Sequence, residues 1–74
     1  MGQMMATLQL NVPRVRQYMD RQGWSERELA GHMDVAYSYI NRVLTGKRGV
    51  GARAIAGFRK AGLNWDEILV VVED

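Results

Sequence analysis

Four polar side chains near the middle of the chain have the types and the spacing to recognise the edges of base pairs. They are Tyr37, Ser38, Asn41 and Arg42, and residues four positions apart share one face of a helix. A guanidinium can bridge O6 and N7 of guanine, and an asparagine amide can bridge N6 and N7 of adenine. Arg42 and Asn41 are therefore the main candidates for base contacts.

Plainer interpretations of the neighbouring residues stay open at this point. The rings of Tyr37 and Tyr39 can simply cover the rim of a core, and Arg42 can be an ordinary solvated helix residue. Lys47 and Arg48, which lie beside glycines, can form a polar turn. The elements around these residues decide between the two interpretations.

Two consecutive short helices are predicted around this set. The pattern Ser25-x-x-Glu28 is a capping box, and Trp24 before it can pack on Leu29, so one helix begins at Ser25. It breaks near Asp34, a residue type that tolerates left-handed backbone. The next helix runs from about residue 36 to 44, with its inner side apolar and Gly46 able to form its left-handed cap.

A pair of helices joined by about three residues, with polar groups on the outside of the second, fits a major groove about 12 Å wide. Ala30 is small enough for the two helices to approach closely, and Ile40 lies ten residues further on, where it can fix their angle. The sequence therefore predicts a helix-turn-helix unit that presents Tyr37, Ser38, Asn41 and Arg42 to DNA.

The residues of this unit resemble a known family. The pattern Ser25-x-x-Glu28-Leu29-Ala30-x-x-Met33-x-Val35-x-x-x-x-Ile40-x-x-Val43-Leu44-x-Gly46-Lys47-Arg48 is similar to the lambda-repressor/Cro-like (XRE-type) helix-turn-helix pattern. The likeness covers about residues 12–69. It differs at Asp34, where the family usually has glycine, and at Ala36, where it usually has a Ser or Thr cap. The terminal strands described below are also outside the family's common core.

The resemblance implies a compact, all-α, five-helix DNA-binding domain of a bacterial or phage regulator. The third helix would enter the groove, so that Tyr37, Ser38, Asn41 and Arg42 contact bases. The loop that follows it would bind the sugar-phosphate backbone. The expected backbone contacts are Ser25, Arg27, Tyr39, Thr45, Lys47, Arg48 and Arg53.

The two ends of the chain are expected to form strands. Residues 7–12 alternate between apolar and polar, and residues 68–73 are rich in β-branched side chains. Between these strands, helices are expected from Pro13 to Gly23, from Ala52 to Gly62, and briefly after an Asn64/Glu67 capping box. The two strands are expected to pair within one chain, between two chains, or both. Because an unpaired apolar edge favours association, we also expect a homodimer through these terminal strands.

Length and charge fit one small domain that binds a polyanion. The 74 residues suffice for a single domain, expected over residues 7–74 after a flexible leader of residues 1–6. The net charge is only +2, but residues 42–60 carry six cations and no acid, whereas the last nine residues carry four acids and no cation. This uneven distribution predicts one face for a polyanion and another turned away from it.

Several classes of function are disfavoured by composition. The chain has no cysteine, which removes thiolate catalysis, disulfides and thiolate metal sites and suits the cytoplasm. With a single histidine, His32, expected to be solvated, no metal site is expected. No phosphate-binding loop or catalytic triad can be assembled, no apolar run reaches about 18 residues, and the two tryptophans are expected to be packing residues.

The sequence thus predicts a cytoplasmic, sequence-specific DNA-binding protein that regulates transcription, expected to be a repressor. It predicts no enzyme activity, no cofactor, no small-molecule ligand and no membrane partner. The alternative that stays open is a protein-binding adaptor or antitoxin with the same fold.

Overall fold

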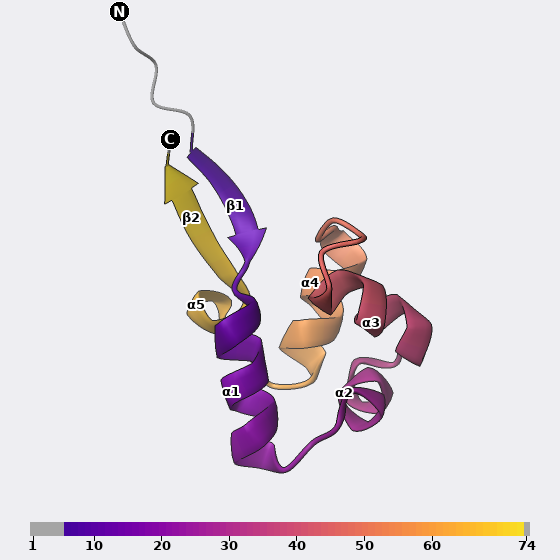
Figure 1. Cartoon of the computed structure of the whole chain (residues 1–74). Coiled ribbons are helices and arrows are strands. Elements are labelled where there is room, and N and C mark those ends of the chain that lie inside the picture. The colour runs from indigo at the N-terminus through magenta and orange to yellow at the C-terminus, as the bar shows by residue number, and fades with distance from the viewer. Residues whose placement is uncertain (1–5, 74) are drawn as a thin grey trace, which may run out of the picture.

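The computed structural model describes residues 6–73, which form five helices between two terminal strands (Figure 1). Residues 1–5 of the expected leader, and Asp74, lie outside the described residues. Along the chain the elements are β1 (Ala6–Leu10), α1 (Val12–Gln22), α2 (Glu26–Met33), α3 (Tyr37–Leu44), α4 (Ala52–Lys60), α5 (Trp65–Ile68) and β2 (Leu69–Glu73). The expected mostly helical fold with a small β-ribbon is confirmed.

The residues predicted at the helix ends around the turn lie there, but each helix begins one residue later than expected, and Ser25 is the N-cap of α2. The Ser25 hydroxyl accepts a hydrogen bond from the Glu28 N–H at 3.2 Å, and the Glu28 carboxylate accepts one from the Ser25 N–H at 3.0 Å. Asp34, with φ of 59°, ends α2 in the left-handed region. At Ala36 no side chain caps α3, which begins at Tyr37, one residue later than expected.

The terminal strands pair antiparallel within the chain, with Leu8 opposite Val71 and Leu10 opposite Leu69. Both predicted strand boundaries were wrong by one or two residues at the junctions with the helices. The first strand ends at Leu10, because the Asn11 side chain caps α1 and so Val12 is already helical. At the other end, Ile68 is the last residue of α5, and its N–H donates to the Asn64 carbonyl.

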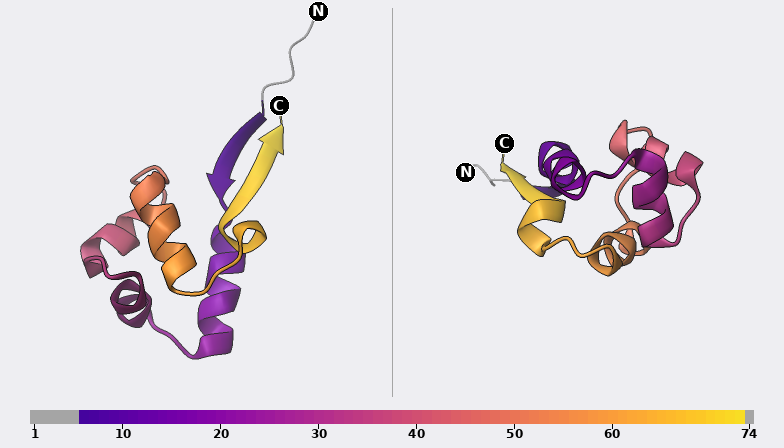
Figure 2. Two further views of the ribbon diagram at one scale, coloured as in Figure 1. Left: turned by 180° about the vertical axis from the view of Figure 1, so that it is seen from behind. Right: turned by 90° about the horizontal axis from the view of Figure 1, so that it is seen from below.

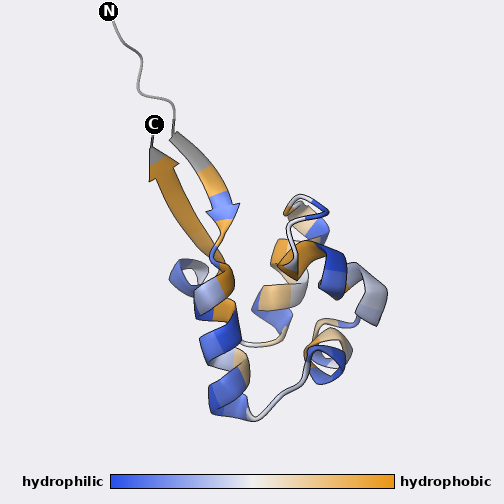
Figure 3. Cartoon of the chain, viewed as in Figure 1, coloured by the Kyte–Doolittle hydropathy of each residue, from blue (hydrophilic) through white to orange (hydrophobic). Residues whose placement is uncertain are grey.

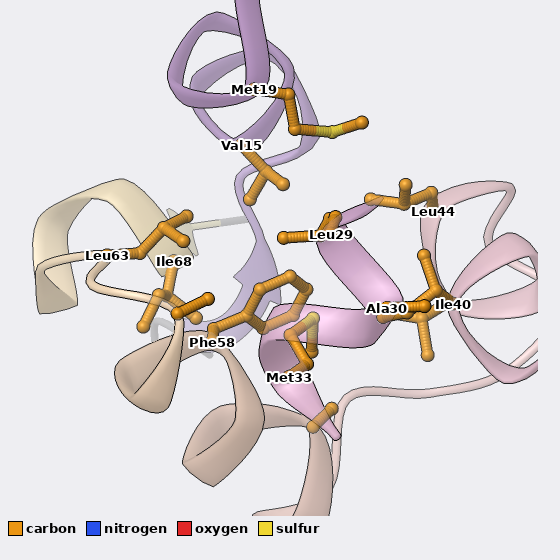
Figure 4. Close-up of a cluster of buried hydrophobic side chains, with 13 residues drawn as sticks. Val15, Met19, Leu29, Ala30, Met33, Ile40, Leu44, Phe58, Leu63 and Ile68 are labelled. Atoms are coloured by element: carbon orange, nitrogen blue, oxygen red, sulfur yellow. The ribbon is translucent and has the colours of Figure 1, made fainter. Parts of the chain in front are cut away.

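One core joins all five helices, and its most deeply buried members come from every one of them (Figure 4). Ala30 and Ile40 are both buried, as expected for the close contact between α2 and α3. The largest side chains with less than 2% of their surface exposed are Phe58, Leu29, Ile40, Leu63, Ile68 and Val15. This shared core fixes the angle between α2 and α3.

The ribbon lies on the opposite side of the molecule from α2 and the start of α3, with α1 and α4 between them (Figure 2). β2 is hydrophobic from Leu69 to Val72 (Figure 3). At the base of the ribbon Leu10 and Leu69 pack on the core, whereas Leu8 and Val71 on the same ribbon face are 65% and 55% exposed. The ribbon therefore carries apolar surface that the rest of residues 6–73 leaves uncovered.

The prediction that both tryptophans are packing residues was correct for one and wrong for the other. Trp24 is partly buried against the core, and its ring stacks on His32 with centroids 3.9 Å apart. His32 itself is exposed, as expected for a residue on the outer side of α2. Trp65 is 55% exposed, because the short α5 turns Glu67 and Ile68 inward and leaves its first residue outside.

None of the helices described over residues 6–73 combines the length and the apolar character needed to cross a bilayer.

Candidate nucleic-acid interface

The four residues predicted to contact bases lie together on the outer side of α3. Tyr37, Ser38, Asn41 and Arg42 line one shallow depression, and Lys47 from the following loop completes it. Three of the four are exposed and Asn41 is half-buried. The opposite side of α3 is held in the core by Ile40, Val43 and Leu44. Because that inner side is fixed, the polar ridge has a defined orientation.

Asn41 is less free than the sequence suggested. Its Nδ2 donates to Oε1 of Glu26, the first residue of α2, at 3.2 Å. The other carboxylate oxygen of Glu26 accepts from Nη1 of Arg16 in α1, also at 3.2 Å. Glu26 was not among the residues singled out from the sequence. It precedes Asn41 by fifteen positions, and no local spacing rule connects residues on two different helices.

Arg27 and Tyr37 join the start of α2 to the start of α3. The Arg27 guanidinium carbon lies 4.5 Å from the centroid of the Tyr37 ring, within the range of a cation–π contact. Both side chains are exposed, and stacking on the ring leaves the guanidinium edge able to donate hydrogen bonds. The structure therefore holds one predicted backbone-contact residue beside one predicted base-contact residue.

The ring of Tyr39 contacts two more of the residues that are predicted to bind the DNA backbone. The guanidinium carbon of Arg48, from the loop after α3, lies 4.9 Å from the ring centroid of Tyr39, and that of Arg53, in α4, lies 5.2 Å from it. Tyr39 is half-buried, and its ring contacts both cations. We call Tyr39, Arg48 and Arg53 the tyrosine-arginine cluster. It concentrates positive charge beside the outer side of α3.

Ser25 and Thr45, also expected at the DNA backbone, serve as structural groups at helix ends. The Thr45 hydroxyl donates to the Asn41 carbonyl at 2.7 Å, in the last turn of α3. Its proton is therefore already used in a hydrogen bond within the protein. The Ser25 oxygen accepts a hydrogen bond from the Glu28 N–H. The capping box also occupies the N–H groups of Ser25 and Glu28, so the start of α2 offers an anion fewer amides than expected.

The start of α2 carries a negatively charged carboxylate as well as backbone N–H groups. Hydrogen bonds from the Ser25 backbone N–H and hydroxyl lower the pKa of Glu28 below its ordinary value. This group is ionised at neutral pH and is stabilised at the positive end of the α2 dipole. Within residues 6–73, no cluster of three or more His, Asp or Glu side chains is arranged to hold a metal ion.

Comparison with known proteins adds no relative, since no family model, curated protein or solved structure matches this chain.

Proposed function

We propose that this protein is a sequence-specific double-stranded DNA-binding protein of bacterial or phage type that regulates transcription, acting as a repressor in the cytoplasm. The observation that carries the proposal is the polar ridge of α3, exposed beside Lys47 while its apolar side is locked against α2. A helix held in this way can enter a major groove without rearrangement. The helix order and turn also support membership in the lambda-repressor/Cro-like group.

Base recognition in this proposal belongs to the side-chain end groups of the ridge. Arg42 has a guanidinium suited to guanine, and the Asn41 amide is suited to adenine. Tyr37 can place its ring on a thymine methyl or donate its hydroxyl to a phosphate. Ser38 is also exposed and can donate to or accept from either base of a pair.

Attachment to the phosphates belongs to the cations around the ridge. Arg27 lies at the start of the ridge and Lys47 lies at its end. The tyrosine-arginine cluster lies beside the ridge. Each neutralised phosphate releases condensed counterions, so the affinity should fall steeply as salt rises. About five or six phosphate contacts per protomer would reduce the contribution of each protomer to the binding constant by roughly a thousandfold between 50 and 200 mM salt.

We further propose that the protein binds as a homodimer through the ribbon. Leu8 and Val71 lie opposite each other in register and are exposed, and a two-stranded ribbon leaves both outer edges free to pair. A second copy would cover this apolar surface. The two α3 helices of a twofold dimer would then meet half-sites about 34 Å apart, which predicts a palindromic operator.

The alternative function is that of a protein-binding adaptor or antitoxin. Trp65, exposed on α5 beneath the Arg59 guanidinium at 5.2 Å, is the observation that favours it, because exposed tryptophan is typical of protein interfaces. Trp65 is remote in sequence from the polar ridge and does not line the depression that the ridge forms. The two functions can therefore be separated by substitution.

Selection from random duplexes at moderate salt tests the proposal. The expected result is an enriched palindromic motif with adenine and guanine positions in each half-site. Enrichment of no motif, together with tight binding of a protein partner that Trp65→Ala abolishes, would support the adaptor instead.

A further inference from the structure

We infer that Glu26 is a specificity-determining residue: it positions the Asn41 amide and thereby sets the preference of that residue for adenine over guanine. The inference rests on the proposed function and assigns a role to a residue that does not itself belong to the polar ridge. It starts from the 3.2 Å hydrogen bond between Asn41 Nδ2 and Glu26 Oε1.

The chemistry of the carboxylate fixes which end of the amide faces it. An ionised carboxylate only accepts hydrogen bonds, whereas an asparagine amide has a donating end and an accepting end of nearly equal shape. With Glu26 beside it, only the NH₂ end can turn toward α2. Reversing the amide would bring Oδ1 of Asn41 against a carboxylate oxygen, which is repulsive. The hydrogen bond therefore selects one of two amide orientations.

That orientation matches the pattern of adenine. The Nδ2 atom carries two N–H groups, and after one is donated to Glu26 the other can still donate to N7 of adenine while Oδ1 accepts from N6. Guanine presents the acceptor O6 where adenine presents its N6 donor. An amide that cannot reverse meets that oxygen with Oδ1, whereas a freely rotating amide can offer its NH₂ group to guanine.

Glu26 is itself held in place from the other side. Arg16 of α1 donates to Oε2 at 3.2 Å, so the two carboxylate oxygens are bound to two different helices. The Glu26 side chain is only 22% exposed, which limits alternative rotamers. The guanidinium of Arg16 also offsets a negative charge that would otherwise face the phosphates. Asn41 is thus oriented by a chain of contacts from α1 through α2 to α3.

The experiment measures the ratio of affinities for the selected duplex with adenine and with guanine at the position that Asn41→Ala identifies. Glu26→Ala is expected to lower this ratio by about tenfold, the loss typical for one bidentate base contact. Glu26→Gln is expected to lower it as well, because a glutamine amide can reverse together with Asn41. Asp20→Asn, an exposed acid on α1, controls for the loss of one negative charge and should leave the ratio unchanged.

A double-mutant cycle separates positioning from a structural effect. In the Asn41→Ala background, Glu26→Ala should no longer change the ratio, whereas general damage to α2 would act in both backgrounds. The side-chain NH₂ signals of Asn41 in the free protein give a second readout. One proton should be shifted downfield in the wild type and lose that shift in Glu26→Gln, a variant that keeps the size of the side chain.

The outcomes distinguish this inference from the proposed function. A wild-type protein that selects a motif, with an adenine-to-guanine ratio that Glu26→Ala and Glu26→Gln both leave intact, would overturn the role of Glu26 and leave DNA recognition standing. If the wild type selects no motif at all, the proposed function fails and the inference fails with it.

Discussion

Met33 and Gly57 lie so close that a β-carbon added to Gly57 would stand 2.9 Å from Cε and 3.2 Å from Cβ of Met33. This contact joins α2 to α4 beneath the helix pair that carries the polar ridge. A flexible methyl end can move aside, but Cβ cannot move without the backbone of α2. The orientation of α2, and with it the contact surface of α3, therefore depends on glycine at position 57.

The first prediction compares this glycine with Gly31, an exposed glycine within α2 where an added β-carbon meets nothing within 4 Å. Gly31→Ala should raise the free energy of unfolding by up to about 1 kcal/mol, because alanine favours helix. Gly57→Ala gains the same propensity but overpacks the core, at a cost of about 1–3 kcal/mol, and should be destabilising overall. Urea unfolding measures both. Two stabilised variants would show that α2 and α4 are farther apart than described.

A second prediction concerns the uncapped start of α3. Ala36 has the extended backbone of an N-cap residue, with φ of −70° and ψ of 146°, but no side-chain oxygen. Ala36→Ser should stabilise the fold by about 1 kcal/mol, which corresponds to roughly 4–8 °C in Tm for a domain of this size. Ala56→Ser, at an exposed position inside α4, is the control and should be neutral or slightly destabilising. Equal thermal shifts in the two variants would rule out a capping effect.

A third prediction follows from Glu67, the buried acid of α5. A hydrogen bond from the Asn64 N–H, aided by Arg21 at 2.6 Å, lowers its pKa below the ordinary glutamate value. A lowered pKa in the folded state means that the group stabilises the fold above about pH 4.3 and that this stabilisation is lost as the pH falls through the folded pKa. Glu67→Gln should therefore flatten the decline of stability in acid.

The measurement is the free energy of unfolding between pH 2 and pH 7, followed by circular dichroism. Asp66→Asn removes an exposed carboxylate from the neighbouring position and serves as the control. A Glu67→Gln protein that loses stability in acid as steeply as the wild type and Asp66→Asn would contradict the assignment.

A fourth prediction tests the homodimer. Leu8→Lys places a charge on the exposed apolar face of the ribbon and should convert the dimer to a monomer in sedimentation velocity, with the helical signal unchanged. Gln9→Lys adds the same charge on the other face of β1, because neighbouring strand residues point to opposite sides, and should leave the dimer intact. A wild-type monomer at tens of micromolar, both free and on DNA, would refute association through the ribbon.

Local signals in the sequence were enough for most of the fold. The Ser25-Glu28 capping box, the left-handed backbone at Asp34 and the missing cap at Ala36 each depend on a few neighbouring residues, and the structure contains all three. The strand boundaries were less predictable, because Val12 and Ile68 fit both the alternating pattern of a strand and the apolar spacing of the adjoining helix. Deciding such junctions requires knowing which hydrogen bonds form, as at Asn11 and Asn64.

The candidate site was predictable as a set of residues but not as a set of contacts. That Tyr37, Ser38, Asn41 and Arg42 share one face follows from helical spacing alone. The pairing of Asn41 with Glu26, and of Tyr37 with Arg27, depends on how α2 crosses α3, which no spacing within either helix specifies. Trp65 shows the same limit, since its exposure depends on which side of α5 meets the core.

The most direct test of the central claim, that the outer side of α3 reads base pairs, is the affinity of Arg42→Ala and Lys47→Ala for every single-base variant of the selected duplex. Arg42→Ala should cost about 1–3 kcal/mol and abolish the preference at one base pair per half-site, while Lys47→Ala should weaken all duplexes alike and reduce the salt dependence by about one ion per protomer. If Arg42→Ala instead leaves the preference unchanged at every base pair, α3 does not read DNA in the way proposed.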